Sequence, residues 1–506
     1  MGRPLLVVNG LVTLFLVSSG CAVGPAYRQP SIGTPAAFKE QSPANLDEAA
    51  TAGWKQSAPG DAYAKGRWWE LYNDPALNAL EEQVNVSNQN VLQAEALYRQ
   101  ARAAIGTARS SLFPTVTTAP AITASGGGTG TSTRSTSASG VATVTGNAST
   151  PSSSTQYTLP LSVSWEPNLW GAVRRGVTAS IATAESTAAN VGNARLLFQT
   201  ELAQNYFGLH GLDGEMELLA RTEASYREFL TLTQNRFAGG IASDLDVAQA
   251  EAQLFAVQAQ LMDLGVQRAA FEHAIAILIG KAPADLTIPP VTLTASPPPV
   301  PLGVPSELLE RRPDVASAER QVAAANEQIG IAMAAFYPNL TLTGDAGLAS
   351  SSLARWLTLP SRFWSVGPQL AATLFDAGRR RAIVAEQRAA YDATVAAYRQ
   401  TVLTAMQQVE DNLAALRILS AEAEIVQRTV QSAARALEIS SAQYRAGTAS
   451  YLTVITSQAT LLTAEVTRVT LLTRRLTASV LLIEALGGGW NASQFPTDQD
   501  SMAARR

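Results

Sequence analysis

Histidine and cysteine are frequent carriers of catalysis and metal binding, and both are scarce in this chain. Its 506 residues include two histidines, His210 and His273, and one cysteine, Cys21. These are too few for an HExxH metal site or a cysteine–histidine triad, and neither a GxxxxGK(S/T) phosphate loop nor a GxSxG elbow occurs. The glycine triplet at 126–128 lies in a low-complexity segment and not between a strand and a helix. We therefore expect no enzymatic activity, no cofactor and no metal ion.

Cys21 lies where a lipid would be attached. Residues 5–17 form an apolar stretch that is too short to cross a bilayer as a helix but has the length of a secretory signal. Small residues then lead into Cys21 as in a bacterial lipobox, except that Ser18 stands where leucine is usual. We predict a signal peptide at 1–20 and lipidation of Cys21, the alternative being an ordinary signal peptide and an unmodified, buried thiol. Ala22, in place of the aspartate that often retains lipoproteins at the inner membrane, favours the outer membrane.

The composition favours long helices and excludes one class of partner. Charged residues are 15% of the chain and aromatic residues 7%, while alanine recurs throughout, which is typical of long packed helices. The formal net charge is −4 and the sequence pI is about 5.5. A chain with this charge and without a lysine- or arginine-rich run has no electrostatic footprint for nucleic acid. We therefore expect no nucleic-acid partner.

The chain contains the same pattern twice. The segment IGTARSSLFP at 105–114 reappears as IGIAMAAFYP at 329–338, and FAGGIASDLDV at 237–247 reappears as YRAGTASYLTV at 444–454. Pairs that follow one another in the same order indicate an internal tandem duplication.

The domain boundaries follow from this duplication. A proline-rich segment at 289–305 cannot be helical and separates the two copies. The remaining predicted regions are an N-terminal lipid-anchored extended segment at 21–73, a first structural repeat at 74–288, a second at 306–490 and a C-terminal tail at 491–506.

Each copy is expected to contain a helix, two strands, a very long helix, a tight turn and another long helix. The very long helices are predicted at about 174–238 and 379–446, each roughly 100 Å long at 1.5 Å per residue. Asp74 before a proline predicts an N-cap at the first helix. A strict 3.5-residue period predicts a coiled coil in the second long helix. Its apolar residues recur at sevens: Val395, Val402, Val409, Leu416, Ala423, Val430 and Leu437.

The segments between the helices alternate residue by residue. Residues 157–165, 340–348 and 364–374 do so clearly, and 116–122 more weakly, which predicts four β-strands with two different faces. Membrane-spanning barrel strands have this pattern, although a half-buried soluble sheet would alternate too. Four strands cannot close a cylinder, and a bilayer tolerates no open sheet edge. A membrane sheet would therefore need several chains, and three chains would supply twelve strands.

Five motifs carry a resemblance to a known family. They are CAVGPAYRQP at 21–30, WWELYNDP at 68–75, PSELLERRPDV at 305–315, FDAGR at 375–379 and ALGGGW at 485–490. In these motifs, and over nearly the whole mature chain, the sequence resembles the TolC-like outer-membrane factors. The resemblance is to the lipoprotein branch of drug-efflux systems, which is the OprM- and NodT-like branch.

The resemblance implies a mainly α-helical fold with a small β part. Long coiled-coil helices would form a trimeric α-barrel in the periplasm, continuous with a twelve-stranded membrane barrel to which each protomer gives four strands. The implied function is a passive exit duct for small molecules such as drugs, anchored in the outer membrane by a lipid. The implied partners are two further copies of the chain, a periplasmic adaptor protein, an inner-membrane pump and outer-membrane lipid. Two alternatives are a channel of the same fold for protein secretion and a lipid-anchored coiled-coil scaffold without a pore.

The family pattern also suggests where a gate would lie. Members often close the periplasmic mouth with acidic side chains in a run like Gly-x-x-x-Tyr-Leu followed by Asp-Ala-Gln. Here the first part matches, and Thr456 replaces the aspartate. The candidate gate therefore contains Leu452 as an apolar ring with Thr456, and the carboxylates of Asp244 and Asp246, whose alternative role is helix N-capping. The candidate adaptor-docking tips are Gly239, Gly240, Ala446 and Gly447.

Overall fold

A computed structural model describes most of the chain that follows the predicted signal peptide. The predicted signal peptide, Cys21 and the C-terminal tail lie outside the described residues, as do most of the loop between the first two strands and residues 299–305 of the predicted linker. The described residues are 23–35, 37–40, 67–126, 153–293, 295–298 and 311–490.

The chain folds into two compact units, each built from both halves of the sequence. The first unit takes its described residues from 1–28, 103–181 and 323–392, and the second takes the rest of the described chain. Within the described chain, none of the helices combines the length and hydropathy needed to cross a bilayer.

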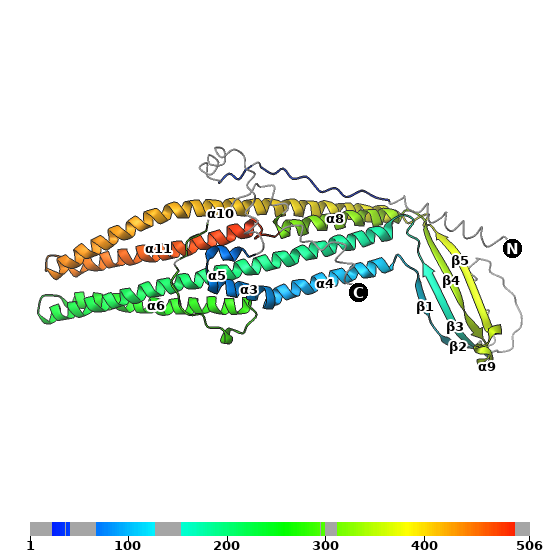
Figure 1. The fold of residues 1–506 in the computed structure, drawn as a ribbon, viewed down its shortest axis with the longest axis horizontal. Coiled ribbons are helices and arrows are strands. Elements are labelled where there is room, and N and C mark those ends of the chain that lie inside the picture. The colour runs from blue at the N-terminus through cyan, green and yellow to red at the C-terminus, as the bar shows by residue number, and fades with distance from the viewer. Residues whose placement is uncertain are drawn as a thin grey trace. The chain divides into compact units, whose positions relative to one another are not determined.

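The order of elements repeats, which confirms the tandem duplication (Figure 1). A short 3-10 helix (Trp68–Tyr72) and α3 (Pro75–Ser87) precede the first copy. That copy consists of α4 (Gln89–Ser110), β1 (Thr115–Thr118), β2 (Ala121–Gly126), β3 (Ser153–Trp165), α5 (Ala172–Ala238) and α6 (Asp244–Leu278). The second consists of α8 (Pro313–Ala334), β4 (Asn339–Ser350), β5 (Arg362–Ala371), α10 (Arg379–Arg445) and α11 (Tyr451–Ala485). Both very long helices have 67 residues and both returning helices have 35.

The first helix starts as predicted and is interrupted once. Asp74 caps α3, because its Oδ1 accepts hydrogen bonds from the backbone N–H groups of Ala76 (2.9 Å) and Leu77 (3.2 Å). Asn88 then separates α3 from α4. Its side chain accepts from the N–H of Val91 (3.1 Å) and donates to the carbonyl of Leu278 (2.7 Å), which fixes this corner to the end of α6.

The sheet of the first unit is antiparallel, in the order β1-β3-β4-β5, with β2 also paired to β3 (Figure 1). The weakly alternating segment 116–122 is not one strand as predicted but two, because Pro120 falls between Thr118, paired with Leu161, and Ala121, paired with Thr158. Pro160 lies opposite this break, so neither proline offers an N–H to the ladder there. β5 ends at Ala371, before the predicted 374, because Ala371 pairs with Asn339, the first residue of β4.

The pairing register gives this sheet one apolar and one polar face. In a pleated sheet, residues opposite each other point the same way. Val163 is opposite Val116 and Gly344, and Gly344 is opposite Val366. The apolar face continues with Ile122, Tyr157, Leu159, Leu161, Trp165, Leu340, Leu342, Leu348, Trp364 and Leu370. The polar face carries Thr117, Thr123, Gln156, Thr158, Ser162, Ser164, Thr341, Thr343, Asp345, Ser365 and Gln369.

The second unit has its largest apolar core around the start of the first repeat. Trp69, Leu77, Leu202, Phe207 and Leu209 are among its fully buried side chains. The coiled-coil prediction is consistent with this packing. Of the residues at intervals of seven along α10, Val402 and Val409 are completely buried and the others are half-buried.

Glu81 is an acidic residue inside this core. Its side chain is fully buried on the same face of α3 as Leu77 and Val84, and neither carboxylate oxygen has a hydrogen-bond partner among the described residues. Burial raises the pKa of Glu81 well above its ordinary value of 4.5. The folded state therefore holds a proton that the unfolded state releases above pH 4.5.

Replacement of Glu81 by methionine is expected to stabilise the protein at neutral pH by about 1–3 kcal/mol, because an unpaired polar group leaves the core. The folded pKa is raised, so the stability of the wild type falls as pH rises from 4.5 through the folded pKa. Thermal unfolding between pH 4.5 and 8 would show this fall in the wild type and its loss in Glu81→Met. The exposed neighbour serves as the control, since Glu82→Met is expected to change stability by less than about 0.5 kcal/mol. A less stable Glu81→Met variant at pH 8 would contradict the prediction.

Candidate functional site

Aromatic side chains mark both ends of the sheet. At one end Tyr157 of β3 contacts Trp356, with ring centroids 5.7 Å apart. At the other end Trp170 stacks on Tyr337 at 4.7 Å and donates a hydrogen bond to the carbonyl of Pro338 (2.7 Å). The part of β3 from Tyr157 to Trp165 has nine residues, and a tilted membrane-spanning strand needs about 9–11. This length, with aromatic residues at both ends, matches a membrane barrel, whose apolar band is flanked by aromatic girdles.

The polar face of the sheet has its own hydrogen bonds. Ser162 of β3 donates to one oxygen of Asp345 (2.6 Å), and Ser365 of β5 donates to the other (3.3 Å). A carboxylate bonded across three strands lies in the middle of this face, opposite the face with Val163 and Val366. The sheet can therefore have water on one side and hydrocarbon on the other.

The two long helical hairpins end in the same turn. Gly240 and Gly447 both adopt positive φ (73° and 76°), which glycine tolerates best. The next residue in each turn bonds back over five positions, from the N–H of Ile241 to the carbonyl of Arg236 (2.8 Å) and from Thr448 to Gln443 (2.9 Å). The predicted tip residues therefore lie in two equivalent turns.

Contacts within the second unit join these two tips. Arg236, near the end of α5, donates to the carbonyl of Tyr444 at the end of α10 (2.9 Å), and its guanidinium carbon lies 4.7 Å from the centre of the Tyr444 ring. The Tyr444 hydroxyl is 3.2 Å from Thr233 Oγ1, and its ring is 5.3 Å from that of Tyr451. A buried cluster containing Phe229 surrounds these residues.

The candidate gate residues have different surroundings. Ser243 caps α6 and forms a capping box with Asp246, whose Oδ2 accepts from the Ser243 N–H (2.9 Å), while the Asp246 N–H donates to Ser243 Oγ (3.2 Å). Asp244 is the first residue of α6 and is exposed. Leu452 is 56% exposed and lies one turn before Thr456, which is also exposed. Asp246 therefore has a capping role, and Asp244, Leu452 and Thr456 remain open to contacts outside this chain.

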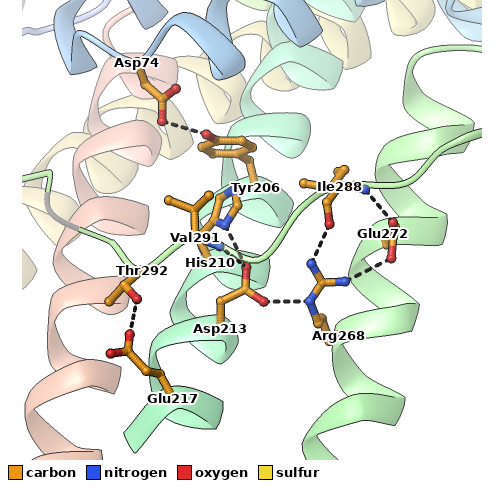
Figure 2. A network of polar contacts seen from close by, with 10 residues as sticks. All are labelled: Asp74, Tyr206, His210, Asp213, Glu217, Arg268, Glu272, Ile288, Val291 and Thr292. Carbon is orange, nitrogen blue, oxygen red and sulfur yellow. Dashed lines mark hydrogen bonds and ion pairs between the residues drawn. The ribbon is translucent and has the colours of Figure 1, made fainter.

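A buried network fastens the segment between the two repeats (Figure 2). Arg268 of α6 donates to Asp213 of α5 (2.6 Å) and to the carbonyl of Ile288 (2.7 Å), and the N–H of Val291 donates to Asp213 (3.1 Å). Burial opposes ionisation of Asp213, but hydrogen bonds from His210, Arg268 and Val291 and the charge of Arg268 outweigh it, so the pKa of Asp213 is lowered.

His210 takes part in this network as a packed residue. Its Nδ1 lies 2.9 Å from Asp213 Oδ2, and its ring lies edge-on to Tyr206 at 4.4 Å (Figure 2). The hydroxyl of Tyr206 donates to Oδ2 of Asp74, the carboxylate oxygen that takes no part in the cap (2.7 Å). Together these contacts position the linker at Ile288 and Val291.

A second buried cluster holds residues 23–25 and was not found from the sequence. Arg175 of α5 and Glu327 of α8 form an ion pair (2.7 Å) whose side chains are only about a tenth exposed. Arg175 and Asn326 both donate to the carbonyl of Pro25 (3.2 and 3.3 Å), and the N–H of Val23 donates to the carbonyl of Trp170 (3.2 Å). The two charged residues are 152 positions apart and lie on helices that are not copies of each other, so neither local spacing nor the duplication suggests the pair.

Comparison with known proteins decides the family. A family model described as outer membrane efflux protein matches residues 80–281 and 304–488. The probable efflux pump outer membrane protein TtgC of Pseudomonas putida is 30% identical over 484 residues, which cover 95% of this chain and 94% of that protein. The chain belongs to the outer membrane efflux protein family.

Solved structures place the fold in the same family. The outer-membrane channel OprN superposes with a TM-score of 0.80 and 28% identity, covering 93% of this chain and all of OprN. The outer membrane protein VceC from Vibrio cholerae gives a TM-score of 0.75 and 28% identity, covering 84% of this chain and all of VceC. The predicted family, the mainly helical duplicated fold and the outer-membrane location of this efflux protein are confirmed.

Proposed function

We propose that the protein is the passive outer-membrane duct of a tripartite efflux pump and that it works as a homotrimer without catalysing a reaction. The observation that carries this is the two-faced sheet, whose apolar face is exposed and whose two ends carry aromatic pairs. Relatives are named as components of toluene, solvent and antibiotic efflux pumps. Small molecules leaving the periplasm are therefore the proposed cargo.

The edges of the sheet support the trimer. Among the described strands, β5 pairs only with β4, while β1 and β2 pair only with β3. Unpaired backbone groups cost several kcal/mol in hydrocarbon, so these edges require partner strands. With β1 and β2 counted as one interrupted strand, three chains supply twelve strands in a closed barrel.

The adaptor of the inner-membrane pump would dock at the tips Gly239, Gly240, Ala446 and Gly447. These residues form the turns that join α5 to α6 and α10 to α11. The lipid would be carried by Cys21, two residues before Val23, which is bonded to Trp170. Mass spectrometry of the mature amino terminus reads this modification directly.

Planar-bilayer recording tests the duct. The purified protein should migrate as a heat-modifiable trimer and give single-channel currents, and its gene should restore drug resistance to a host that lacks its own duct. A monodisperse monomer with full β content in mild detergent, or a trimer that conducts no ions, would overturn the proposal.

At the gate, Asp244→Asn is expected to lower cation selectivity and weaken block by multivalent cations, because three exposed carboxylates would face a narrow axis. Asp246→Asn breaks the capping box and is expected to cost about 1 kcal/mol of stability as well. Thr456→Asp should add an acidic ring near Leu452 and strengthen the block. Bilayer recordings compare the three variants with the wild type. Unchanged selectivity and block in all of them would place the mouth elsewhere.

A further inference from the structure

A groove of about 760 Å³ lies in the first unit, where the end of α8 meets the start of α10. Its apolar wall includes Met333, Phe336 and Tyr337, and the two aromatic rings remain more than two-fifths exposed. Two arginines of α10, Arg381 and Arg388, line the groove beside this wall. The groove thus combines apolar surface with positive charge.

The two arginines lack protein partners, in contrast to their neighbour. Arg380 forms an ion pair with Asp376 (2.5 Å), donates to the carbonyl of Thr373 (2.7 Å) and lies over the ring of Phe336 (5.3 Å). Within the described part of the chain, Arg381 and Arg388 have neither a carboxylate nor a carbonyl acceptor. They are seven residues apart, so they lie on the same side of α10, two turns from each other. Asp392 is the one acidic residue of the groove lining and lies one helical turn after Arg388.

The groove lies next to the strand ends. Tyr337 lies two residues before the start of β4, and the first pair of β4 and β5 is Asn339 with Ala371. Tyr337 also stacks on Trp170 in the aromatic girdle at this end of the sheet. Because the helices continue from here, this is the periplasmic end of the membrane band. The groove therefore lies at the level of lipid head groups on that side.

We propose that this groove binds an anionic phospholipid of the periplasmic leaflet. Arg381 and Arg388 hold the phosphate, since guanidinium groups at a membrane surface attract phosphate by charge-assisted hydrogen bonds. The first part of the acyl chains packs against the aromatic wall around Phe336. Arg381, nearer the strands, lies on the membrane side of the groove, and Asp392 lies farthest from it. This inference rests on the outer-membrane location and not on the transport of any cargo.

Native mass spectrometry of the full-length protein in detergent tests the site. Phosphatidylglycerol and phosphatidylcholine are titrated separately into the assembled wild type and into the double variant Arg381→Gln with Arg388→Gln. The wild type should bind phosphatidylglycerol about tenfold more tightly than phosphatidylcholine. The double variant should lose this preference and bind both lipids equally.

The same helix offers a matched control pair. Arg428 and Arg435 are also exposed and seven residues apart on α10, but lie in the second unit away from the strands. Their replacement by glutamine should leave the lipid preference unchanged. Channel currents of each preparation are recorded alongside, so a loss of the duct is distinguished from a loss of lipid.

Four results would overturn the proposal. The first is an unchanged lipid preference in the groove variant, and the second is an equal loss in the control variant. The third is displacement of the lipid by millimolar inorganic phosphate, which would mean a site for soluble anions. The fourth is dissociation of the groove variant into subunits that still prefer phosphatidylglycerol, which would assign the two arginines to a contact between copies of the chain.

Discussion

Replacing Val366 by arginine is expected to destabilise the membrane-inserted protein by about 2–4 kcal/mol. Val366 lies in the middle of β5, opposite Gly344, and is 79% exposed on the apolar face of the sheet. A charged side chain on the lipid face of a barrel costs this much near the bilayer midplane. Urea titration of the protein folded into phosphatidylcholine vesicles, followed by heat-modifiable migration, measures the difference.

The control for this variant lies one residue away. Ser365 has the same depth but points to the polar face, where its hydroxyl bonds to Asp345. Ser365→Arg would place the new charge beside that carboxylate and in water, so we expect less than about 1 kcal/mol of destabilisation. Equal costs for the two arginines would show that the faces of the sheet do not separate lipid from water.

Removing the charge of Glu327 is expected to cost about 3–5 kcal/mol, because it leaves the buried guanidinium of Arg175 without its counter-charge. The Glu327→Gln variant should therefore unfold at a clearly lower temperature than the wild type. The same change loosens the segment at Pro25, since Arg175 is one of its two donors. Limited proteolysis of the mature amino-terminal segment should be faster.

A double variant distinguishes charge from packing at this pair. Arg175→Met with Glu327→Met removes both ions and leaves apolar chains of similar size, which is often neutral or stabilising. Most of the lost stability should return, while Pro25 keeps only the bond from Asn326. A double variant as unstable as Glu327→Gln would mean that the shape of the side chains, and not their charge, decides the stability here.

The sequence predicted the features that depend on local spacing. The observed bounds of α5 and α10 agree with the predicted ones within two residues. Arginine-rich segments lie at the start of both helices, glycine turns follow their ends, and the helical period continues without a break between. The alternation along β3 was predicted correctly, because successive side chains of a pleated strand point to opposite faces. The capping role of Asp74 was also predicted, because a cap depends on neighbours two and three residues away.

Features that depend on distant partners were missed or misplaced. The break at Pro120 became visible only with Pro160 opposite it. Ser243, and not an aspartate, caps α6, which changes the interpretation of Asp246. Glu81 is unremarkable in the sequence of α3, and its burial depends on the helices that cover it. The groove beside Arg381 likewise needs two segments about fifty residues apart.

The equal lengths of the helices constrain how such a duct could change its reach. An insertion in α5 alone would advance its tip by 1.5 Å and turn it by about 100° for each added residue, which would separate Arg236 from the carbonyl of Tyr444. The same insertion in α10, with matching insertions in the returning helices α6 and α11, would restore the match, and seven residues at a time would also keep the apolar stripes aligned. Ducts of this design should therefore lengthen or shorten by about 10 Å at a time, the length of seven helical residues, and both hairpins should change together. The width of the periplasm that one chain can serve would then vary in steps and not continuously.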